Sequence, residues 1–198
     1  MRATAKFPLG DVATISAGHP VRGAIEHLDA GDVFMLQMRD VDWVRGVNWE
    51  GAARIAPPGK REPDYLFPGD IIFTSRGGRY QAITIAEVPA PAICAPNLFI
   101  IRVKKQGNIL PDYVSWYMNS RPCQMYFQRS ATGTNILNIR REFIEQLVLP
   151  APSLVMQKTI VDLYAVARRE RELLYSLIIN RDQQMEALAF GLAECTEA

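Results

Sequence analysis

The feature that most constrains this chain is a proline-free stretch of roughly forty residues near its C-terminal end. The stretch runs from Ser153 to Ala193 and follows the segment Leu149-Pro150-Ala151-Pro152. As one helix it would be about 60 Å long at ~1.5 Å per residue, which is too long for a single core helix of a small domain. A helix of this length normally needs a partner, so we predict a coiled coil.

Apolar residues recur along the stretch close to a heptad seam. Glu170, Arg181 and Gln184 interrupt the seam, and polar residues at such positions fix register and orientation at some cost in stability. The alternative is a helix folded back on its own domain, which its length opposes. The predicted dimerisation residues are Ile160, Leu163, Ala167, Leu174, Leu177 and Leu188.

The chain before the stretch reads as mixed α and β structure, so the predicted fold class is α+β with a long C-terminal helix. Runs rich in β-branched and aromatic residues predict strands, and a proline beside an aspartate predicts a helix start. The expected strands lie within 33–44, 71–75, 82–88 and 98–103, and the expected helix spans 111–119. We expect a recognition domain over 1–152, a helical spacer and dimerisation helix over 153–193, and a tail over 194–198.

Composition and apolar patterning indicate the cellular compartment of the protein. The net charge is +1, and the three cysteines are widely spaced without a Cys-x-x-Cys pair. No apolar run approaches the ~20 residues of a membrane span, and the start of the sequence lacks the apolar core of a signal peptide. A cytoplasmic protein that does not contact a membrane is therefore predicted.

Motifs for catalysis are missing from the sequence. It contains only two histidines, no lysine preceded two positions earlier by an acid, and no phosphate-cradling Gly-x-x-x-x-Gly-Lys. The segment Ser75-Arg76-Gly77 is not a Gly-x-Ser-x-Gly elbow. We expect no catalytic residue, no metal site and no cofactor.

Binding chemistry is concentrated in four basic windows. Arginine can donate two hydrogen bonds to guanine, Asn and Gln can pair with adenine, and hydroxyls and backbone amides reach phosphates. Each window alone is more simply a solvated loop, but four on one small body favour nucleic-acid binding. The predicted DNA contacts are Gln37 and Arg39, Lys60 and Arg61, Ser75, Arg76, Arg79 and Tyr80, and Thr134, Asn135 and Arg140. For Thr132–Asn138, a structural role between body and helix is equally compatible with the sequence.

Three segments together resemble the specificity subunits of type I restriction–modification systems: LGDVATISAG, PGDIIFTSRGG and ATGTNILNIRREFIEQLVLPAP. The last segment is the most specific, because its Gly-Thr, Asn-Ile, Leu and Pro-x-Pro elements lead directly into the long helix. The resemblance implies a target recognition domain followed by a helical spacer. The usual member of the family carries two such units in tandem, whereas this sequence has one and is similar to half-size members that must pair.

The resemblance also implies partners. Specificity subunits have no catalytic activity; they bind two methyltransferase (M) subunits, which use S-adenosylmethionine, and an endonuclease (R) subunit, which uses ATP. We expect a homodimer, formed by antiparallel packing of 153–193, that reads an interrupted palindrome in double-stranded DNA. Two alternatives are a helical-tail scaffold without duplex specificity and an enzyme holding a metal at Asp40/Asp42 or Glu62/Asp64.

Overall fold

A computed structural model describes most of the chain, which divides into two compact units, residues 1–161 and 162–198. The described residues are 5–21, 25, 27–28, 31–42, 46–56, 63–77, 80–105, 108–133 and 137–194. Each unit is described by itself below. The first is mixed α/β, and the long C-terminal helix α5 (Leu154–Glu194) makes up the described part of the second, which confirms the predicted fold class.

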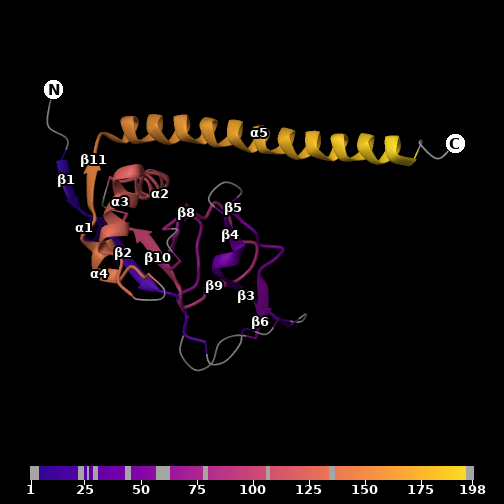
Figure 1. The fold of residues 1–198 in the computed structure, drawn as a ribbon. Helices are drawn as coiled ribbons and strands as arrows, with labels where there is room; N and C mark the ends of the chain where they lie inside the picture. The colour runs from indigo at the N-terminus through magenta and orange to yellow at the C-terminus, as the bar shows by residue number, and fades with distance from the viewer. Residues whose placement is uncertain are drawn as a thin grey trace. The chain divides into compact units, whose positions relative to one another are not determined.

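A four-stranded antiparallel sheet forms the centre of the first unit (Figure 1). Its strand order is β2 (Ala13–Ala17), β10 (Leu98–Val103), β7 (Ile71–Thr74) and β8 (Ala82–Thr84). Successive side chains of a strand point to opposite faces. In β7, Ile71 and Phe73 therefore enter one core cluster while Ile72 enters another. Because β7 is buried on both faces, its sequence is a continuous apolar run rather than an alternating one.

Helices cover one face of this sheet. The helices α2 (Pro111–Met118) and α3 (Arg121–Ser130) contribute Tyr113, Met118 and Phe127 to the larger core cluster, where the Phe127 ring lies 4.9 Å from that of Phe73. The short helices α1 (Leu9–Val12) and α4 (Arg141–Glu145) pack near the same cluster.

A second small sheet lies toward the other face. Its order is β6 (Ala53–Ile55), β3 (Val33–Leu36) and β9 (Ala92–Cys94), with β3 and β9 parallel. The 3₁₀ helix η1 (Met38–Asp40) follows β3 and leads into the pair β4 (Val41–Asp42) and β5 (Gly46–Val47). Phe34 and Leu36 of β3 share a core cluster with Ile72, so the two sheets pack on each other.

An ion pair between Asp70 and Arg102 joins neighbouring strands of the central sheet at the start of β7. Asp70 is 2 % exposed, and its two carboxylate oxygens accept hydrogen bonds from Nε and Nη2 of Arg102, both at 2.7 Å. Arg102 also donates to Asp64 and to the carbonyl of Tyr65. The hydrogen bonds to Asp70 raise the pKa of Arg102 above its already high value, so the guanidinium stays charged. Bidentate geometry of this kind fixes both position and orientation.

The two ends of the first unit meet. Strand β1 (Ala5–Pro8) pairs antiparallel with β11 (Val148–Ala151), directly before the helix α5. The proline-rich segment before α5 therefore lies largely in a paired strand and is not a free linker.

The first two turns of α5 belong to the first unit. Gln157 is fully buried; its Nε2 donates to the carbonyls of Asn108 (3.0 Å) and Pro152 (2.8 Å), and its Oε1 accepts from the Leu110 N–H (2.9 Å). Ile160, a predicted seam residue, is partly buried against the core of the first unit. The sequence did not predict the burial of Gln157, because a single Gln in a helical segment has no pattern that indicates burial.

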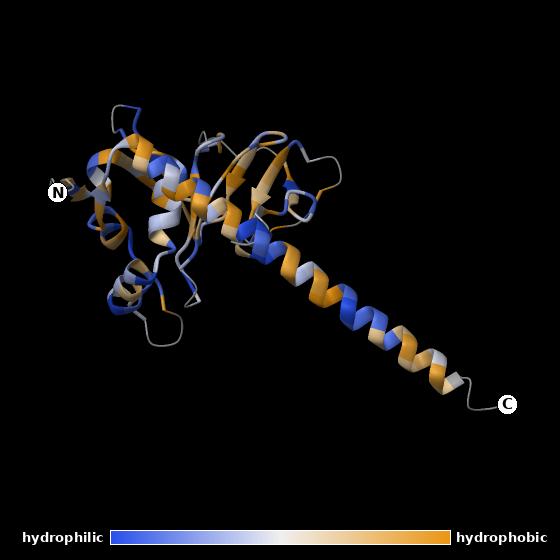
Figure 2. Cartoon of the chain, turned by 90° about the horizontal axis from the view of Figure 1, so that it is seen from above, coloured by the Kyte–Doolittle hydropathy of each residue, from blue (hydrophilic) through white to orange (hydrophobic). Residues whose placement is uncertain are grey.

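From Asp162 onward, the side chains of α5 are exposed or half-exposed, and large apolar residues are among them (Figure 2). Leu163, Leu174, Leu177 and Leu188, all predicted seam residues, are each more than half exposed. Within the described chain, no helix combines the length and apolarity that crossing a bilayer requires.

The sequence located the strands at 71–75 and 98–103 and the helix at 111–119 within about one residue. The expected strand 82–88 ends at Thr84, and the expected strand in 33–44 is interrupted by η1. Helices α3 and α4 and strand β9 were not predicted.

We predict that Gln157→Met, which keeps the length of the side chain but removes its donors and its acceptor, lowers the free energy of unfolding by about 3 kcal/mol. The reason is that one buried N–H and two carbonyls lose their partner, at roughly 1–3 kcal/mol for a fully buried group. Urea unfolding followed by circular dichroism measures the change. Val155→Ala, at a neighbouring position that is 78 % exposed, serves as the control and should change the value by less than about 0.5 kcal/mol. An equally small effect of Gln157→Met would contradict the role given to Gln157.

Candidate nucleic-acid interface

Two of the basic windows meet through backbone hydrogen bonds. At the end of β7, Ile139 N–H donates to the Ser75 carbonyl (3.0 Å) and Gly77 N–H donates to the Leu137 carbonyl (3.3 Å). These bonds bracket an antiparallel bridge in which Arg76 lies opposite Asn138. Segments more than 60 positions apart in the sequence are thereby held side by side.

The same bridge extends to Thr132. Thr132 and Asn138 exchange two backbone hydrogen bonds, of 3.1 and 2.9 Å. Residues directly opposite in antiparallel pairing project their side chains from the same face. Arg76, Asn138 and Thr132 therefore form a row that presents a guanidinium, an amide and a hydroxyl. The Asn138 Oδ1 is buried and has no donor among the described residues, which is costly until a donor is supplied.

The 3₁₀ helix η1 lies next to this row. Gly77 adopts φ +81°, and a Cβ at Gly77 would lie 4.0 Å from the Cε of Met38. We call the segments 37–40, 75–77, 132–133 and 137–140 together the junction surface.

The segment of η1 is held by reciprocal capping. Gln37 N–H donates to the Asp40 carboxylate at 2.9 Å, and Asp40 N–H donates to the Gln37 carbonyl at 3.0 Å. Burial raises the pKa of the Asp40 carboxyl, against the lowering effects of the Gln37 N–H and of Arg39. Arg39 is 69 % exposed with its Nε 3.7 Å from Asp40. Its guanidinium is therefore accessible from solvent.

Three predicted contact residues, Arg39, Arg76 and Arg140, are exposed arginines on the junction surface. Arg140 directly precedes α4. The adjacent Arg141 forms an ion pair with Glu145 at 2.7 Å, one helical turn away. The only fully buried acid of the surface, Asp40, faces inward, so the exposed charge of these arginines is available to an anion.

Two predicted contacts need correction. Ser75 is 2 % exposed, and its Oγ donates to the Asn97 carbonyl. Tyr80 is fully buried with its ring edge against Phe127, and its carbonyl accepts from Gln124. These two side chains cannot touch a ligand in this structure; they anchor the loop between β7 and β8 at both ends.

The remaining predicted contacts, Lys60, Arg61, Arg79, Thr134 and Asn135, lie outside the described residues. Thr132 and Asn138 lie in one of the predicted basic windows and Met38 lies between two predicted contacts, but the sequence did not predict that these segments meet. Asn138 is bridged to both Arg76 and Thr132 through the backbone, and a contact of this kind between distant segments has no local sequence pattern.

The first unit offers no obvious metal chemistry in the part of the chain that the structure describes, where no group of three or more His, Cys, Asp or Glu side chains converges. The Asp40/Asp42 pair does not form a site: Asp40 is buried and held by η1, whereas Asp42 is exposed. Glu62 of the other pair lies outside the described residues, and Asp64 bonds to Arg102.

Comparison with known proteins finds similarity in structure rather than in sequence. No family model matches the chain, and no curated protein matches it by sequence. The fold is similar to the S subunit of the type I restriction–modification system from M. genitalium, with a TM-score of 0.57 and 16 % identity, over 90 % of this chain and 42 % of that one.

Two further solved structures are similar. One is the HsdS subunit from Thermoanaerobacter tengcongensis, with a TM-score of 0.57 and 15 % identity over 84 % of this chain and 37 % of that one. The other comes from work on complex assembly and conformational transition of the type I R-M system, with a TM-score of 0.62 and 15 % identity over 86 % and 39 %. This chain thus spans about two fifths of the length of the proteins it matches and shares their fold.

We predict that Gly77→Ala destabilises the protein by about 1–2 kcal/mol, because φ +81° is strained for any residue with a Cβ. Gly191→Ala, in α5 with open space around the added methyl, should not destabilise the protein. Thermal unfolding of both variants measures the difference. Equal stability of the two variants would contradict the tight turn at Gly77.

Proposed function

We propose that this chain is a DNA-specificity subunit of a type I restriction–modification system. In this proposal, residues 1–152 are the target recognition domain, and 153–193 is the spacer and dimerisation helix. The observation that carries the proposal is the fold shared with S subunits over 84–90 % of the chain.

The junction surface supplies the chemistry for reading duplex DNA. Arg76 offers a bidentate donor for guanine, and its neighbour Thr132 offers an exposed hydroxyl. Arg39 and Arg140 contact phosphates, whose negative charge dominates affinity for the duplex. Because Arg76 lies just beyond the end of β7 and its backbone is bridged to Asn138, the guanidinium projects from hydrogen-bonded backbone.

Two copies of the chain pair through α5 and hold two recognition domains on one duplex. A closed two-fold dimer reads an inverted repeat, and the gap between half-sites follows from dimer geometry. The M subunits, with S-adenosylmethionine, and the R subunit, with ATP, supply the chemistry, and this chain brings them to the site.

Selection from a random duplex pool by the purified protein tests the proposal. We expect two short inverted half-sites separated by a fixed gap. A dimer that enriches no sequence would instead support the helical-tail scaffold.

We predict that Arg76→Ala weakens binding to the selected site by about 1–3 kcal/mol and relaxes the preference at one base position of each half-site. Fluorescence anisotropy with the selected duplex and its single-base variants measures both effects. Arg121→Ala, an exposed arginine of α3 outside the junction surface, is the matched control and should retain the preference. A uniform loss over all sequences would mark Arg76 as a phosphate contact.

We predict that removing one heptad of α5, residues 173–179, shortens the preferred gap. Seven residues correspond to about 10 Å of helix, or roughly three base pairs of duplex. The deletion leaves the heptad phase on either side intact, so pairing is retained. Repeating the selection with the deleted protein measures the gap, and an unchanged gap would show that α5 does not set the spacing.

A further inference from the structure

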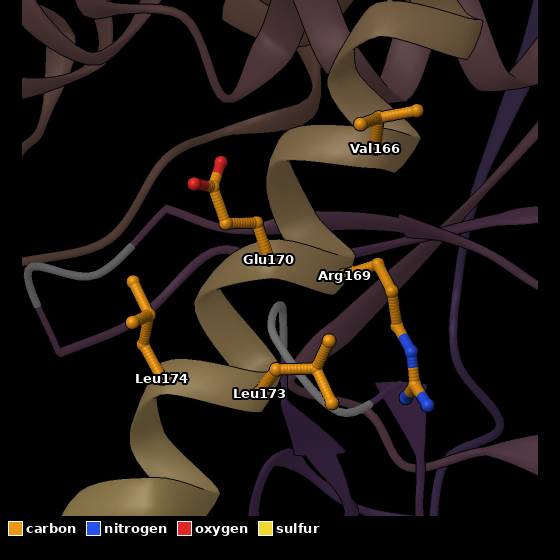
Figure 3. Close-up of a pocket in the computed structure, with 5 residues that line it drawn as sticks. All are labelled: Val166, Arg169, Glu170, Leu173 and Leu174. Carbon is orange, nitrogen blue, oxygen red and sulfur yellow. The ribbon is translucent and has the colours of Figure 1, made fainter.

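The seam of α5 contains two charges at positions where leucines would be expected. In the heptad, Ala167, Leu174 and Leu188 share position a with Arg181, and Leu163 and Leu177 share position d with Glu170. Figure 3 shows Glu170 projecting from α5 on the same side as Leu174, one turn further along. The charge therefore lies within the apolar stripe and not on the opposite face.

These two charges lack partners within the described chain. Glu170 and Arg181 are exposed, and no ion pair is formed by either among the residues that the structure describes. By contrast, Arg168 and Arg169 beside them both pair with Glu172, at 3.7 and 3.1 Å. Packing the seam against an apolar surface would desolvate Glu170 and Arg181 without compensation, which is strongly unfavourable.

We propose that a second copy of this chain packs antiparallel on α5, with the two-fold axis crossing between Tyr175 and Ser176. The inference rests on the proposed homodimer and specifies its register. Glu170 then faces Arg181 of the second copy, and by symmetry Arg181 faces Glu170 of the second copy. The dimer therefore contains two symmetry-related ion pairs, and each charged residue of the seam faces an opposite charge.

The same axis matches the rest of the seam. Each residue before the axis faces the residue the same number of steps after it, so Leu163 faces Leu188 and Leu174 faces Leu177 of the other copy. Ala167 faces Gln184, a small residue opposite a longer polar one. In every layer a position a meets a position d, as antiparallel knobs-into-holes packing requires.

Competing registers lose these pairings. If the second helix slides by one heptad so that the two-fold axis moves toward the N-terminus of α5, Glu170 lies opposite Leu174 and Arg181 lies opposite Leu163. A shift the other way places Glu170 opposite Leu188 and Arg181 opposite Leu177. A parallel dimer in register places Glu170 against Glu170 and Arg181 against Arg181, and like charges repel. Only one arrangement pairs both charges, so Glu170 and Arg181 select the register and the orientation.

Charge reversal tests the pairing. Glu170→Arg carries two arginines in the seam and Arg181→Glu carries two glutamates, so each variant alone opposes like charges. We expect each to dimerise at least roughly tenfold more weakly than the unaltered chain, because two reciprocal pairs become two repulsions. Mixed in equal amounts, the two variants should form a heterodimer of near-normal affinity, measured by analytical ultracentrifugation. The double variant E170R/R181E should also dimerise normally.

Cysteine cross-linking tests the register independently, in a Cys195→Ser background. Cys94 and Cys123 do not interfere, since both are buried and burial raises the pKa of the Cys123 thiol to about 11. L163C/L188C should form cross-linked dimers on oxidation, whereas L163C alone and L188C alone should not. Cross-linking of either single variant would indicate a parallel dimer and overturn the register.

The outcomes separate the two proposals. A stable dimer whose affinity is unaffected by charge reversal, or that fails to cross-link as L163C/L188C, overturns the register and leaves the homodimer intact. An unaltered chain that remains monomeric at all concentrations overturns the homodimer of the proposed function itself.

Discussion

Strand β7 is the element on which the rest of the first unit depends, since it is buried on both faces and belongs to two core clusters at once. A slip of one residue would turn every side chain to the wrong layer, so its register is strongly specified. The buried Asp70, held by two 2.7 Å hydrogen bonds from Arg102, fixes where the strand begins. Its end is fixed by the bridge from Arg76 to Asn138. Arg76 is exposed at the end of a rigid strand, which is the arrangement that a base-reading side chain needs: mobility would cost conformational entropy on binding.

The long helix follows from a different constraint. Gln157 satisfies one backbone N–H and two carbonyls of the first unit and thereby commits the first turns of α5 to that unit. The remainder of α5 has no core of its own, because a single helix cannot bury its apolar stripe. Leucines of α5 that are more than half exposed form an apolar surface in contact with water. Pairing with a second helix, as we propose, would bury this surface at a gain of about 25 cal/mol per Å². In the dimer that we propose, Glu170 and Arg181 select the arrangement of the two helices, since leaving either charge unpaired would offset much of that gain.

The sequence was informative where patterns are local. The buried run Ile71–Thr74 and the proline-led helix at Pro111 have signatures within a few residues, and both lie where they were predicted. The absence of proline after Pro152 predicted the long helix in the same way. The candidate site was predicted less well, because its assembly is non-local. Arg76 and Arg39 are exposed as expected, but Tyr80 is a core residue: an aromatic near two arginines has the same local pattern whether it stacks on a base or anchors a loop. The bridge that brings Asn138 to Arg76 depends on tertiary structure and leaves no periodic trace.

The central claim is that two copies of this chain, each with one recognition domain, read one duplex through a shared helical pair. The stoichiometry of the protein–DNA complex tests this claim most directly. Native mass spectrometry of the purified chain with a duplex carrying its selected site should give two chains per duplex. With one half-site scrambled, the same measurement should show a marked loss of that complex at equal concentrations. A complex of one chain per duplex, unchanged when half of the site is scrambled, would contradict the account.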